Sequence, residues 1–199
     1  MVSLGANAHD LDFDFSVARS VASTFTAVAS TLESQAASRA SCESTASGQF
    51  RGYFSQLFTS NMASAQADRD EIASALRDVA QGAQDIAQAA REENERRRVA
   101  HEYVTKHDNW WEKTWDYLFG QEPPPRLEVN PAPTIHTSAP PPEPRETPAP
   151  GASGGPNMGV SSASPADLKS AAQGLASLDE SVAGKPAQLE RALEDFAAS

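Results

Sequence analysis

The sequence predicts an all-α protein built around a long antiparallel helical hairpin. Two alanine-rich stretches carry apolar residues at helical spacing, and a short run that ends in Phe50-Arg51-Gly52 separates them. Apolar residues make up 39% of the 199-residue chain and aromatic residues only 7%, which favours thin layers of packed helices over a thick mixed core.

The first predicted helix covers roughly residues 14–45. Its apolar side chains recur every three or four residues, and so form one stripe: Val17, Val21, Phe25, Val28 and Leu32. Ala36 and Arg39 continue this register weakly, and a run of serine and threonine that closes on Gly48 ends the helix.

The second predicted helix is longer, at roughly residues 53–107. Its stripe follows a near-heptad repeat that Arg69 interrupts: Phe58, Met62, Ala65, Ile72, Leu76, Val79, Ala83, Ile86 and Ala90. Small side chains let two helices approach closely while burying little area per contact. We therefore expect residues 1–107 to form a coiled-coil-like hairpin, with its turn near 48–52 and a shallow groove for a partner helix.

A tryptophan-rich segment at residues 108–120 follows and is predicted to be a short amphipathic helix. It would dock on a partner or pack back across the hairpin. An interfacial membrane anchor is the third interpretation, and Glu112 and Asp116 disfavour it because they would repel anionic lipid. The candidate docking residues are Trp110, Trp111, Trp115, Leu118 and Phe119.

Residues 121–163 are predicted to be a disordered linker. Twelve of the 14 prolines lie between Pro123 and Pro156, a composition that favours polyproline II and no packed core. A passive spacer is the preferred interpretation, with a PxxP ligand as the alternative.

Residues 164–199 are predicted to form a partial second helical hairpin. Ser164 suits a helix N-cap and Pro165 the first helical position, and Gly184-Lys185-Pro186 marks a stop and a new start. The two apolar stripes are Leu168, Ala172, Leu175, Leu178 and Val182, then Leu189, Leu193 and Phe196.

Composition also argues against several functions. The net charge of −11 disfavours nucleic acid as a partner, and the single cysteine, Cys42, allows no intrachain disulfide. No phosphate-binding loop or nucleophile elbow occurs, and we expect no enzyme activity, cofactor or metal. The four histidines lack zinc-site spacing: His9, His101, His107 and His136.

Two helices joined at an aromatic-x-Gly turn resemble the WXG superfamily of type VII (ESX-like) secretion substrates, here over roughly residues 13–107. Phe50 stands where the family typically has tryptophan, and Gly52 matches the family glycine. The family's export signal, a tyrosine followed four residues later by an acid, has a degenerate counterpart in Tyr103, with His107 at the acid position and Asp108 one place later. The tryptophan segment, proline linker and second helical unit look like N-terminal regions of actinobacterial multidomain substrates.

This resemblance implies a non-enzymatic protein that acts by helix–helix recognition. Its partners would be another helical-hairpin protein, in a homo- or heterodimer, and a secretion ATPase. The protein would be made in the cytoplasm and exported without a signal peptide, since neither such a peptide nor a spanning segment occurs in the sequence. The alternatives are a structural coiled-coil spacer and a peripheral membrane protein that uses the tryptophan segment.

Overall fold

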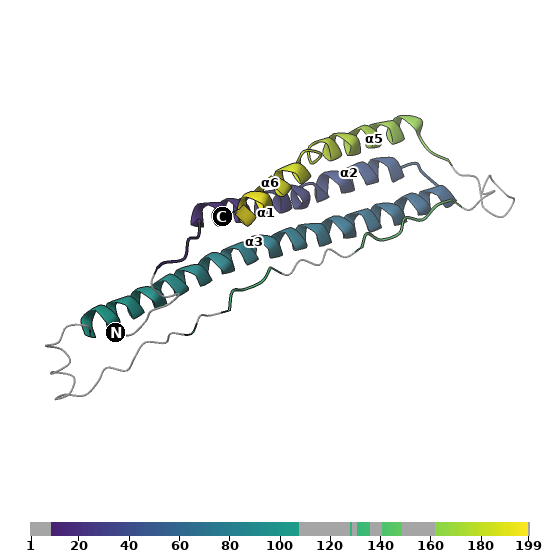
Figure 1. Ribbon diagram of the computed structural model, residues 1–199. Coiled ribbons are helices and arrows are strands. Elements are labelled where there is room, and N and C mark those ends of the chain that lie inside the picture. Colours follow the sequence, from purple (N-terminus) through teal and green to yellow (C-terminus); the bar gives the residue numbers. More distant parts are fainter. Residues whose placement is uncertain (1–8, 108–127, 129–130, 136–140, 149–161, 199) are drawn as a thin grey trace.

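The computed structural model describes residues 9–107, 128, 131–135, 141–148 and 162–198. It confirms the all-α class, because 78% of the described residues are helical and none of them lies in a strand. The helices are α1 (Phe15–Ser34), α2 (Ala36–Ser47), α3 (Tyr53–His107), α5 (Pro165–Glu180) and α6 (Lys185–Ala198). They form three layers, with α1 and α2 between the long α3 and the pair α5 and α6 (Figure 1).

The helices α1 and α3 pack antiparallel, as contacts at both ends of α1 show. Arg91 of α3 lies over the ring of Phe15, and Arg77 of α3 pairs with Glu33 near the end of α1. The core between them consists of Val21, Ala22, Phe25, Val79, Ala80 and Ala83. Ile72, expected in this seam, is instead 47% exposed, and Ala73 is buried in its place. The seam therefore keeps small residues where a heptad register would place a large one.

The first predicted helix is divided in two at Gln35, which separates α1 from α2. Two hydroxyls in the last turns of α1 donate to backbone carbonyls: Thr31 Oγ1 to Ala27 O at 2.8 Å and Ser34 Oγ to Thr31 O at 2.9 Å. Such bonds compete with the helical ladder and bend helices. The single helix expected over 14–45 is therefore a pair broken at one residue.

The C-terminal helices do not form the expected second hairpin. The helix α5 packs on α2 and α6 packs on α1, and α5 and α6 do not pack against each other. They run one after the other along the α1–α2 layer, as Figure 1 shows. The physical reason is that each has a single narrow apolar stripe, and the exposed side of α1 and α2 offers that stripe a larger surface to cover.

The described parts of the proline-rich linker lie along α3 (Figure 1). Ile135 packs against Gly82, where a Cβ would lie 2.9 Å from its Cγ1. Further along, Arg145 pairs with Asp68 at 2.5 Å. The Glu146 N–H also donates to Asn61 Oδ1 at 2.8 Å. Gly82 and polar side chains of α3 therefore contact the described linker residues Ile135, Arg145 and Glu146.

Candidate functional site

The turn between α2 and α3 is built by Phe50, Arg51 and Gly52. Gly52 has a φ of 93°, in the left-handed region that glycine adopts without steric cost, and α3 begins at the next residue. The Phe50 ring lies 6.1 Å from the ring of Phe58 in α3. The two predicted turn residues, Phe50 and Gly52, therefore both lie in the turn between α2 and α3.

Arg51, the middle residue of the turn, closes the C-terminus of α2. Its guanidinium donates to the carbonyls of Ser47 at 3.1 Å, Gly48 at 3.2 Å and Phe50 at 2.9 Å. A cation at this end also interacts favourably with the helix dipole. The Arg51 N–H donates to Ser162 O at 2.8 Å, so the turn is tied to the residues that precede α5.

The residues of the expected export signal lie at the other end of α3. Tyr103 is half-buried in the last turns, and the helix ends at His107. A helix of 55 residues extends about 80 Å, so the turn and this signal are far apart. Asp108 lies outside the described residues, and so do all the expected docking residues: Trp110, Trp111, Trp115, Leu118 and Phe119.

A groove of about 550 Å³ follows one side of the contact between α1 and α3. We call it the α1–α3 groove. Several of its lining side chains are small, including Ala22, Ala27 and Ala87. The remaining lining residues are Phe15, Ala18, Arg19, Ser23, Thr26, Gln84, Gln88 and Arg91.

The charged side chains that line this groove are both arginines. Arg91 lies 5.1 Å above the ring centroid of Phe15, and Arg19 lies one turn along α1. The lining holds no carboxylate among the residues the structure describes. In a chain with a net charge of −11, this groove is therefore a locally basic surface.

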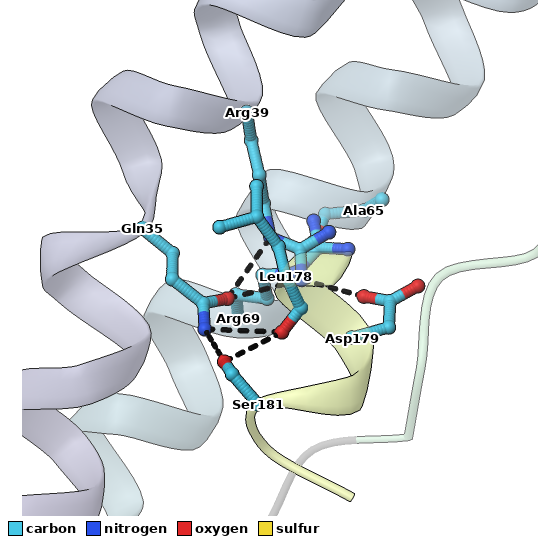
Figure 2. A network of polar contacts seen from close by, with 7 residues as sticks. All are labelled: Gln35, Arg39, Ala65, Arg69, Leu178, Asp179 and Ser181. Atoms are coloured by element: carbon cyan, nitrogen blue, oxygen red, sulfur yellow. Dashed lines mark hydrogen bonds and ion pairs between the residues drawn. The ribbon is translucent and has the colours of Figure 1, made fainter. Parts of the chain in front are cut away.

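A second feature is a polar network, buried at Gln35 and Arg39, where α5 meets the break between α1 and α2. Figure 2 shows its residues, which we call the polar latch: Gln35, Arg39, Leu178, Asp179 and Ser181. The Arg39 guanidinium donates to Asp179 Oδ1 at 2.5 Å and to Gln35 Oε1 at 3.0 Å. The Gln35 amide donates to Ser181 Oγ at 2.7 Å and to Leu178 O at 3.2 Å.

The latch is asymmetric in its burial. The Arg39 side chain is only 4% exposed, whereas that of Asp179 is 65% exposed. Arg69 of α3 lies beside it and donates to Ala65 O at 2.9 Å (Figure 2). Burial lowers the pKa of Arg69 from its ordinary value, and the nearby charge of Arg39 lowers it further. The positively charged guanidinium groups of Arg39 and Arg69 therefore lie near each other beside α5. The negative charge of Asp179 offsets part of the repulsion between them.

Ion pairs around Glu93 help to tie the segment before α1 to α3. Glu93 accepts from Arg96 at 2.5 Å and from Arg97 at 2.9 Å, and it is buried. The hydrogen bond from Arg96, followed by that from Arg97, holds the pKa of Glu93 at about 2 against the opposing effect of burial. Arg97 also donates to His9 O at 2.8 Å, which fixes the segment that leads into α1.

The sequence interpretation missed the polar latch, although it contained one signal. Arg39 falls on the apolar stripe of the first predicted helix, and a charge on a buried stripe needs a partner. Within the described residues, no cluster of side chains is placed to hold a metal ion. None of the described helices is long and apolar enough to cross a membrane.

Comparison with protein-family models, curated proteins and solved structures returns no match for this chain.

Proposed function

We propose that this chain is a non-enzymatic helical protein that recognises other proteins by helix–helix contact, as a type VII secretion substrate or trafficking module. In this proposal it pairs with another helical-hairpin protein and docks on a secretion ATPase. The resemblance of the Phe50-Arg51-Gly52 turn to the WXG superfamily supports the secretion context. The departures at Phe50 and His107 make export the step that most needs a test.

The α1–α3 groove is the observation that carries the recognition part of the proposal. Its small side chains would let a partner helix approach both α1 and α3 closely, which is how helices pack when alanine lines the contact. Arg19 and Arg91 at its edge favour a partner helix that carries carboxylates. The bound state would then resemble a hairpin with a third helix laid along its seam.

An export assay with a groove variant tests both parts. Ala27→Trp places a large side chain at an exposed position in the groove, whereas Ser38→Trp places the same side chain at an exposed position of α2 outside it. Wild type and Ser38→Trp should leave cells only when the type VII apparatus is intact, and Ala27→Trp should stay inside. Export of all three without the apparatus would contradict the proposal.

A structural spacer is the second candidate, and the length of α3 favours it. Ion pairs stabilise α3 from within at three and four residues' distance, including Arg98 with Glu95 and with Glu102. Such a helix needs less support from neighbours over its last turns. A spacer should self-associate and remain in the cell in every genetic background, which separates it from the secretion proposal.

A further inference from the structure

Residues 141–148 of the linker lie along α3 and are held there by polar contacts (Figure 1). All eight residues are exposed, so apolar burial does not determine where the segment lies. Four of them are proline, and proline restricts a chain to extended conformations before it binds. The contacts fall between Ser60 and Asp68, whereas the α1–α3 groove begins on α3 at Gln84. A ligand at Ser60 to Asp68 would therefore not compete with a helix bound in that groove.

Two polar side chains of α3 bind the backbone of this segment. The Asn61 side chain donates from Nδ2 to Glu146 O at 2.9 Å, and its Oδ1 accepts from the Glu146 N–H at 2.8 Å. Asp68 Oδ1 accepts from the Glu143 N–H at 2.9 Å. A proline at position 143 or 146 would remove the donor, and the prolines stand at 141, 142, 144 and 148 instead. The sequence therefore keeps an N–H at both positions where α3 accepts one.

The spacing of the two α3 side chains matches that of an extended segment. Asn61 and Asp68 are seven residues apart, which is about 10.5 Å along the helix axis and places them on the same side of α3. Three residues of polyproline II, from Glu143 to Glu146, span about 9 Å. A proline-rich segment that runs antiparallel to α3 therefore brings both pairs of groups into register.

Side chains of the segment add charge to this pattern. Arg145 pairs with Asp68 Oδ2 at 2.5 Å, and Ser60 Oγ donates to Glu146 Oε1 at 3.1 Å. The hydrogen bond from the Glu143 N–H lowers the pKa of Asp68 from its ordinary value, and the bond from Arg145 lowers it further, against the opposing effect of burial. One carboxylate therefore accepts from a backbone N–H and from a cation two residues further along the same segment.

We propose that the stretch of α3 from Ser60 to Asp68 is a recognition site for an extended peptide, and that its ligand is the chain's own motif at residues 143–146, Glu-Pro-Arg-Glu. The site requires an N–H at the first and fourth positions of the motif, arginine at the third and a carboxylate at the fourth. Because the chain carries this motif in cis, at a high effective concentration, the motif competes with a copy of it that is supplied in solution.

A peptide titration followed by NMR tests the site. The probe is a synthetic peptide of residues 141–148. The protein is the full chain with Glu143→Pro and Arg145→Ala, which remove two contacts of the resident motif, and we call it the released chain. The peptide should shift the amide signals of residues 60–68 in a saturable way, and it should bind the released chain at least about tenfold more tightly than the wild-type chain, whose site is occupied. Equal affinity for both chains, or no saturable shift at residues 60–68, would overturn the proposal.

Substitutions in the site and in the peptide test its specificity. Asp68→Asn in the released chain removes the carboxylate charge and should weaken peptide binding about fivefold, whereas Glu71→Gln, at a nearby exposed position of α3, should leave it unchanged. A peptide with Arg145→Ala should bind the released chain about fivefold more weakly than the unchanged peptide. If neither Asp68→Asn nor the arginine-free peptide weakens binding, the assigned contacts are not the site.

The pKa of Asp68 tests the backbone contact without added peptide. Glu143→Pro removes the N–H that donates to Asp68, whereas Glu143→Ala keeps it. NMR titration should show a higher pKa of Asp68 in Glu143→Pro than in the wild-type chain, and a pKa in Glu143→Ala close to that of the wild type. The same pKa of Asp68 in all three chains would contradict the binding of this motif to α3.

Discussion

The helices α5 and α6 cover the same layer, yet different forces hold them. The polar latch fixes α5, in which Asp179 reaches the buried Arg39, and Gly174 lies so close to α2 that a Cβ would be 2.6 Å from Cys42 Sγ. The helix α6 has no buried residue, and it packs through half-buried apolar side chains, including Phe196, whose ring lies edge-on to that of Phe13. Directional polar contacts therefore specify one position for α5, whereas a narrow apolar stripe specifies the position of α6 less strictly.

The largest expected effect comes from the apolar core beneath α6. Phe25 is 3% exposed and contacts the seam of α3, so Phe25→Ala should lower the free energy of unfolding by about 3–5 kcal/mol. Chemical denaturation followed by circular dichroism measures this loss. A loss below about 1 kcal/mol would show that the hairpin does not depend on this core.

Substitutions of the two partners of the Arg39–Asp179 ion pair should lower the free energy of unfolding by different amounts, and both losses should be smaller than that of Phe25→Ala. Asp179→Ala leaves the Arg39 guanidinium buried with only Gln35 as a partner, which should cost about 1–2 kcal/mol. Arg39→Met removes the buried charge and keeps its volume, and should cost less because Asp179 is well solvated. The unfolding free energies of the two variants decide this, and equal losses would contradict the asymmetry.

Gly174 tests the close approach of α5 to α2. Alanine favours a helix over glycine by about 1 kcal/mol, but at this position its methyl group would collide with Cys42 Sγ. Gly174→Ala should therefore destabilise the wild-type chain and stabilise a chain with Cys42→Ala. A double-mutant cycle measures the coupling. The same sign in both backgrounds would mean that the two helices are further apart.

The smallest expected effect concerns pH. The folded-state pKa of Glu93 is about 2, below its ordinary value of 4.5, so its stabilising contribution is complete above pH 4.5 and is lost as the pH falls towards 2. Glu93→Gln should flatten the dependence of the unfolding free energy on pH within this window. Glu71→Gln, at an exposed position of the same helix, serves as the control. An unchanged slope in Glu93→Gln would contradict the assigned pKa.

The sequence predicts helices well where an apolar stripe is long and a turn is marked. The bounds 53–107 of α3 and the turn at Gly52 follow from periodicity and glycine geometry. The positions of α5 on α2 and of α6 on α1 could not be predicted in this way. The apolar stripe of each helix shows that it needs a surface to pack against, but it does not show which surface. The latch was missed for a related reason: Arg39 and Asp179 are 140 positions apart, and nothing local pairs them.

Native-state amide hydrogen exchange on the full chain compares α5 and α6 most directly. We expect amides in the middle of α6 to exchange at least about tenfold faster than those in the middle of α5, because α6 opens without breaking the latch. Equal exchange of the two helices would contradict the claim that the polar latch holds α5 more firmly than apolar contacts hold α6.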